Sequence, residues 1–110
     1  MIDWTRVAEL RDEIGPEDFS EVAELFLMEV EDTLARLTSA QSDPAQMQEL
    51  MHFLKGSALN LGFSNLAEIC STAEKTAAHG DCDVDISRLK LLYIQARQLF
   101  EAEYALRFAA

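Results

Sequence analysis

The chain has 110 residues, which suits a single domain over 1–110, and its formal net charge is −11 with 49% hydrophobic residues. This acidity excludes the basic surface that nucleic acids require and disfavours binding to anionic membranes. No apolar run approaches the ~20 residues that span a bilayer, and the N-terminus lacks the basic and apolar regions of a signal peptide, so we expect a cytoplasmic protein.

Turn signals divide the chain into five helical segments, and no segment has the pattern of a strand. The first helix is predicted from about Asp3, its N-cap, to Ile14. Pro16 suits the first turn of the second helix, which runs to about Thr38. A loop is expected over 39–42.

Three further helices follow in the second half of the chain. Pro44 starts the third helix, and Gly62 stops it. Ser64 is expected to cap the fourth helix, which breaks before Gly80. The last helix is predicted over 85–107.

The predicted helices determine the fold class. Four of the five are long and amphipathic, and short loops join them. Because such helices bury their apolar faces against one another, we predict an all-α fold, an up-down antiparallel four-helix bundle with an additional short N-terminal helix. Since four long helices can close a core within one chain, we expect a monomer.

The third helix carries an exposed histidine. Its apolar residues recur at helical spacing and gather on one face: Met47, Leu50, Met51, Leu54, Ala58 and Leu61. His52 points about 140° away from the middle of that face, towards solvent. Lys55 follows one turn later, and Gly56 lies near the centre of the polar face, where a glycine costs about 1 kcal/mol relative to alanine. This pattern predicts a reactive imidazole with a nearby cation and room for a partner.

Other chemistries have less support in the sequence. Ser57 and His52 lie about 140° apart around the helix axis, so they do not form a hydrolytic pair. No Gly-rich nucleotide loop is present. Glu49 and His52 have the Glu-x-x-His spacing of di-iron bundles, but His79, the other histidine, has no glutamate three positions earlier. We therefore predict no metal site and no autonomous kinase or hydrolase.

The segment from His52 to Gly62 closely resembles the signature of histidine-containing phosphotransfer (HPt) domains. That signature is His-x-x-Lys-Gly, then a small residue, then a further glycine ten positions after the histidine. Length, helix order and the position of the histidine helix also fit, and without a flanking kinase or receiver segment the chain resembles a free-standing HPt protein. The resemblance implies a phosphorelay shuttle. Such a protein takes a phosphoryl group from a response-regulator receiver domain, or from a histidine kinase or hybrid kinase, and passes it to another receiver.

The resemblance implies a role for each matching residue. His52 is the phosphorylated residue, Lys55 lies near the phosphoryl oxygens, and Gly56 leaves space for the loops of the receiver. Ser57 takes the small position with a structural role, and Gly62 permits the turn that follows. No cofactor is implied for this chain, because the Mg²⁺ is expected on the receiver domain.

Further residues are expected to support or dock. Some HPt domains hold Nδ1 of the histidine with a glutamine or acidic side chain from the next helix, and Glu74 is the candidate here by its distance along the chain. Leu59, together with Trp4 or Val7 of the first helix, is expected to form the apolar centre of a receiver-docking surface around His52. The alternative function is a helical interaction module that binds or sequesters receivers without phosphotransfer.

Overall fold

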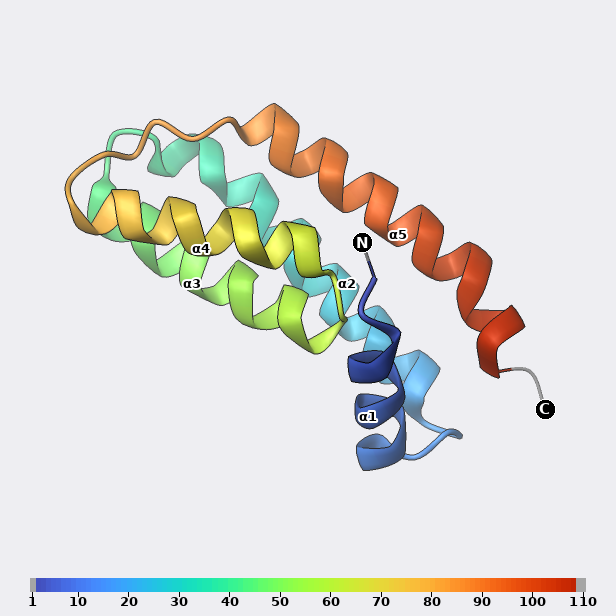
Figure 1. Ribbon diagram of the computed structural model, residues 1–110. Helices are drawn as coiled ribbons and strands as arrows, with labels where there is room; N and C mark the ends of the chain where they lie inside the picture. The colour runs from blue at the N-terminus through green and yellow to red at the C-terminus, as the bar shows by residue number, and fades with distance from the viewer. Residues whose placement is uncertain (1, 109–110) are drawn as a thin grey trace.

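The computed structural model describes residues 2–108, and most of them are helical (Figure 1). The elements are α1 (Trp4–Ile14), α2 (Phe19–Arg36), the 3-10 helix η1 (Leu37–Ala40), α3 (Pro44–Asn60), α4 (Ser64–Ala78) and α5 (Ile86–Phe108). Within residues 2–108 the only β-type pairing is one isolated antiparallel bridge between Ile2 and Phe63. The predicted all-α fold class is therefore confirmed.

The four long helices surround a common core. α3 contacts α2 and α4, and α5 contacts the same two helices. α3 and α4 lie side by side and are joined by a tight turn, while α5 runs past them towards α1 (Figure 1). α1 contacts α2 and α3 and covers one end of the bundle. This arrangement leaves one face of α3 and α4 open.

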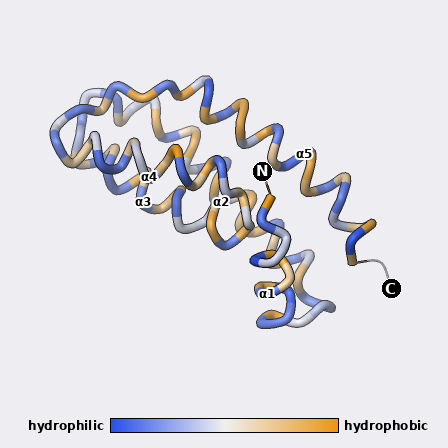
Figure 2. Tube along the Cα trace, in the orientation of Figure 1, coloured by the Kyte–Doolittle hydropathy of each residue, from blue (hydrophilic) through white to orange (hydrophobic). Residues whose placement is uncertain are grey.

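Apolar periodicity explains how each helix packs. Hydrophobic and hydrophilic residues are interspersed along the helices in Figure 2, and in an amphipathic helix the hydrophobic ones gather on one face. On α3, the predicted apolar face is buried except for the half-buried Leu50; its buried members are Met47, Met51, Leu54, Ala58 and Leu61. Burial of each large apolar side chain stabilises the fold by about 1.5–3 kcal/mol, so packing of this face fixes the orientation of the opposite, polar face.

The start and end of α2 differ from the prediction. Pro16 does not begin this helix, because it lies in a turn in which the N–H of Phe19 donates to the carbonyl of Gly15 at 3.1 Å. Gly15 has a φ of 102°, a conformation that favours glycine and redirects the chain. The loop expected over 39–42 is also partly helical, since η1 continues α2 through Ala40.

The ends of α3 are set by local hydrogen bonds. Asp43 caps its start, where its carboxylate accepts from the backbone N–H of Gln46 at 3.2 Å. Ser64 does not cap α4 as predicted. It is the first helical residue, Phe63 occupies the cap position, and the Ser64 hydroxyl donates to the carbonyl of Gly62 instead. None of the helices within residues 2–108 has both the length and the apolar character needed to cross a bilayer.

Candidate functional site

His52 lies on the outward face of α3. Its side chain is 71% exposed, while the neighbouring Met51 and Leu54 are fully buried. The exposure follows from the periodicity of α3, because packing of the apolar face turns the opposite face towards solvent. An imidazole in this position is accessible to a second protein.

Glu74 of α4 contacts both His52 and Lys55. Its Oε1 atom lies 2.9 Å from His52 Nδ1, and its Oε2 atom accepts from Lys55 Nζ at 2.7 Å. The contact forms because α3 and α4 pack side by side, so residues far apart in sequence become neighbours. The Glu74 side chain is 18% exposed and that of Lys55 28% exposed. The ion pair is therefore partly shielded, while the imidazole remains in solvent.

The charge of Glu74 determines the tautomer of His52. The hydrogen bond from Lys55 is the main reason that the pKa of the Glu74 carboxyl is lowered; burial opposes this, and the hydrogen bond with His52 adds to it. Glu74 is therefore ionised at neutral pH, and an ionised carboxylate only accepts hydrogen bonds. Nδ1 of His52 must carry the proton in this contact, so in the neutral ring Nε2 has the free electron pair.

Neither the backbone conformation of Gly56 nor its surroundings require a glycine at this position. It lies on the exposed face of α3, its backbone is helical, and a Cβ added there would meet no atom within 4 Å. The chain nevertheless keeps the residue that weakens a helix interior most after proline. The space around this position on the exposed face of α3 therefore does not itself call for a glycine.

Ser57 and Gly62, the two other residues of the signature, are both buried. Ser57 is buried beneath the exposed face of α3. Gly62 has a φ of 74°, and a Cβ added there would lie 2.6 Å from the backbone oxygen of Asp3. The N–H of Asp3 donates to the Gly62 carbonyl at 2.7 Å, which ties the N-terminal segment to the turn between α3 and α4. The turn after α3 therefore requires glycine at position 62.

The three residues expected to dock a receiver lie in different environments. Leu59 is exposed on α3, as its place on the His52 face predicts. Val7 has no exposed surface, so the prediction that it contributes to a docking surface is wrong; α1 packs this side chain into the core. Trp4 is half-buried, because its indole stacks on Phe100 of α5 at 5.8 Å and lies under the guanidinium of Arg107 at 4.6 Å.

Sequence reasoning missed one exposed apolar residue on this face. Phe53, next to His52, is 45% exposed and lines a groove between α2 and α3 with Glu29 and Thr33. The available signal was that Phe53 falls outside the apolar stripe of α3, where the core does not need it.

The remaining candidate groups lie apart from His52 or have low reactivity. Nδ1 of His79 lies 2.8 Å from the carbonyl of Lys75 at the end of α4. Burial, with a contribution from Glu74, raises the pKa of the Cys70 thiol to about 12, so it stays protonated. Residues 2–108 contain no group of three or more histidine, cysteine or acidic side chains arranged to hold a metal ion.

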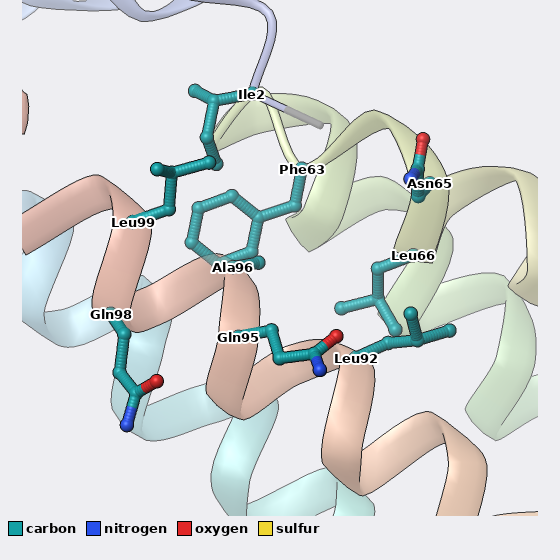
Figure 3. A pocket seen from close by; sticks show the side chains of 9 residues that line it. All are labelled: Ile2, Phe63, Asn65, Leu66, Leu92, Gln95, Ala96, Gln98 and Leu99. Carbon is teal, nitrogen blue, oxygen red and sulfur yellow. The ribbon is translucent and has the colours of Figure 1, made fainter.

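A mainly apolar pocket of about 440 Å³ lies between α4 and α5. Figure 3 shows that Phe63, Leu99 and Ile2 gather at one end of it, with Leu66 and Leu92 at the other. None of the residues around His52 lines this pocket. It therefore belongs to the packing of α5 and not to the histidine site.

Comparison with known families identifies the chain. The family described as Hpt domain matches residues 21–99, from α2 to the middle of α5. The chain belongs to the Hpt family. Members of this family take part in histidine phosphotransfer within two-component phosphorelays. The match includes His52, Lys55, Gly56 and Glu74, but not α1. No curated protein and no solved structure is significantly similar to the chain.

Proposed function

We propose that this Hpt protein carries a phosphoryl group on Nε2 of His52 between receiver-domain aspartates, or from a hybrid histidine kinase to a receiver. The observation that carries the proposal is the exposed His52 ring held at Nδ1 by the ionised Glu74. Most of the side chain is exposed to solvent, and Nε2 is the nitrogen that Glu74 leaves free. The monomeric state and the cytoplasmic location remain part of the proposal.

The proposed transfer uses the free electron pair of Nε2. This nitrogen attacks the phosphorus of an aspartyl phosphate, the N–P bond forms, and the O–P bond breaks with its electron pair left on the aspartate. Onward transfer is the reverse reaction on a second receiver. Because such reactions depend mainly on positioning and charge stabilisation, the chain needs few catalytic groups of its own.

Lys55 and Gly56 complete the proposed site. Lys55 lies one turn after His52 and supplies a cation for the phosphoryl oxygens, whose negative charge spreads during transfer. Gly56 keeps the face of α3 flat, so that the active-site loops of a receiver can approach. The Mg²⁺ and its acidic ligands are expected to belong to the receiver domain.

Exposed apolar side chains support docking on this face. Leu59 and Phe53 are exposed near His52 on α3. A few residues provide most of the binding energy in protein interfaces, and we expect these two to be among them. The same residues also favour the second candidate function, in which the protein binds or sequesters receivers without phosphotransfer.

Transfer from a labelled phospho-receiver separates these two functions. Wild-type protein and the His52→Gln variant are mixed with each of a panel of phosphorylated receivers, and the label on each protein is followed. We expect label on the wild type alone, lost in acid and retained in alkali, as a phosphoramidate requires. Receivers that bind both proteins and transfer to neither would instead support the interaction module.

A further inference from the structure

Glu74 differs from a neutral hydrogen-bond partner because it places a full negative charge against Nδ1. Building on the proposed function, we propose that Glu74 keeps Nδ1 of phosphorylated His52 protonated, which makes the N–P bond labile and favours onward transfer over storage. Glu74 acts through the imidazole and does not contact the phosphoryl group, so it is a positioning residue. Its contact with Nδ1, at 2.9 Å, carries the proposal.

The chemistry depends on one proton. Attack by Nε2 of the neutral ring leaves a proton on Nδ1 and the phosphoryl group on Nε2, so the ring is cationic. When the N–P bond then breaks, its electron pair returns to Nε2 and a neutral imidazole leaves, while the phosphoryl group bonds to a carboxylate oxygen of the receiver or to water. If Nδ1 first loses its proton to solvent, the leaving group is an imidazolate anion, which leaves far more slowly.

Two carboxylates and one cation lie around His52. Glu74 faces it from α4, and Glu49 lies one turn earlier on the exposed face of α3. Lys55 is the opposing cation, but it pairs with the second oxygen of Glu74. The Cys70 thiol beside Glu74 stays neutral because its pKa is raised to about 12. A phosphoryl group on His52 competes with Glu74 for Lys55, and release of Lys55 leaves more of the carboxylate charge on the Nδ1 proton.

The test is the pH profile of phosphoryl loss. Wild-type protein and the Glu74→Gln variant are both loaded with phosphoramidate, so slow transfer from a receiver does not affect the comparison. Glutamine has nearly the same size and can still accept from Nδ1, but without the charge. We expect rapid phosphoryl loss to persist to higher pH in the wild type than in the variant. Near pH 8 the Glu74→Gln variant should lose its label about tenfold more slowly than the wild type, which corresponds to a shift of the pH profile by about one unit.

The matched control is Glu68→Gln. Glu68 is an exposed carboxylate on α4, but it lines the groove towards α5 and so faces away from His52. This variant should give the wild-type profile. Circular dichroism of all three proteins checks that each is folded at each pH.

Two results distinguish this inference from the proposed function. If the profile of Glu74→Gln superimposes on that of the wild type, the role of Glu74 is overturned even where receivers phosphorylate His52. If the profiles differ as expected but no receiver transfers to the wild type, the chemistry of Glu74 stands and the shuttle function fails. Chemical loading that never labels His52 overturns both.

Discussion

Two regions of this molecule use polar side chains for different purposes. Between α2 and α5, Arg97 donates to Glu24 at 3.2 Å and to Glu31, and Tyr93 donates to Glu31 at 2.5 Å. These contacts join two helices that are distant in sequence. They hold α5 on the bundle, together with the aromatic stack at its C-terminal half.

On α3 and α4 the polar side chains instead surround an exposed ring. Glu74 contacts both His52 and Lys55, His52 remains 71% exposed, and a Cβ added at Gly56 would meet no neighbouring side chain within 4 Å. The glycine at position 56 lowers the stability of the helix, and the His52 ring is exposed to solvent. We infer that the α2–α5 contacts stabilise the fold, whereas in the proposed function the α3–α4 contacts position a reactive group. Matched substitutions in the two regions test this division.

The largest expected difference in stability is between substitutions of two phenylalanines, one buried and one exposed. Phe63 is 1% exposed and packs on Tyr93 and Phe100, so Phe63→Ala should lower the free energy of unfolding by about 3–5 kcal/mol. Phe53 is exposed, so Phe53→Ala should change the free energy of unfolding by about 0.5 kcal/mol or less and should weaken receiver binding instead. Urea unfolding and receiver titration measure the two effects. Equal losses of stability would contradict the division.

The two glycines should respond in opposite directions. Gly62→Ala places a Cβ 2.6 Å from a backbone oxygen at positive φ, and it should destabilise the fold by about 1–3 kcal/mol. Gly56→Ala should stabilise the protein by up to about 1 kcal/mol and slow phosphotransfer. Thermal unfolding and transfer kinetics check this pair. A Gly56→Ala variant with unchanged transfer would show that the open face does not serve a partner.

The two partly buried cations form the next comparison. Arg97→Met removes the ion pairs with Glu24 and Glu31 of α2 and should cost about 1–2 kcal/mol of stability, without changing the rate of transfer per folded molecule. Lys55→Met should cost about 1 kcal/mol or less of stability but reduce the transfer rate by about tenfold or more. Urea unfolding and single-turnover transfer distinguish them. The prediction fails if Lys55→Met transfers at the wild-type rate.

The smallest effect is a pH dependence of stability. The pKa of Glu74 lies below its ordinary value of 4.5 in the folded protein, so its ionised form stabilises the fold above pH 4.5, and this contribution is lost as pH falls through the lowered pKa. Glu74→Gln should therefore reduce the loss of stability between pH 7 and acid by about 1 kcal/mol or less. Unfolding of this variant as a function of pH, with Glu68→Gln as the control, measures this contribution. Identical acid sensitivity of Glu74→Gln and wild type would contradict the prediction.

Much of the site could be predicted from the sequence because it depends on local periodicity. The repeat of buried residues on α3 determines that His52 and Gly56 face solvent, and Pro44 marks where that helix begins. Glu74 could be proposed only from a family resemblance, since its contact with His52 requires the packing of α4 against α3.

The incorrect predictions concern tertiary contacts and turn geometry. The pattern of α1 identifies one apolar face, but not that Val7 is covered by the bundle and Trp4 by α5. Pro16 was assigned to α2, whereas the positive φ of Gly15 places it in a turn. The pattern of α3 alone could not show that Phe53 lines a groove with Glu29 and Thr33 of α2.

The most direct test of the central claim is to locate the phosphoryl group after transfer from a phospho-receiver. The labelled protein is digested under alkaline conditions, which preserve phosphohistidine, and its peptides are analysed by mass spectrometry. The chain has two histidines, so the assignment is unambiguous. We predict the phosphoryl group on the peptide that contains His52. Its recovery on His79 would contradict the account, as would its absence from a protein that binds the receiver.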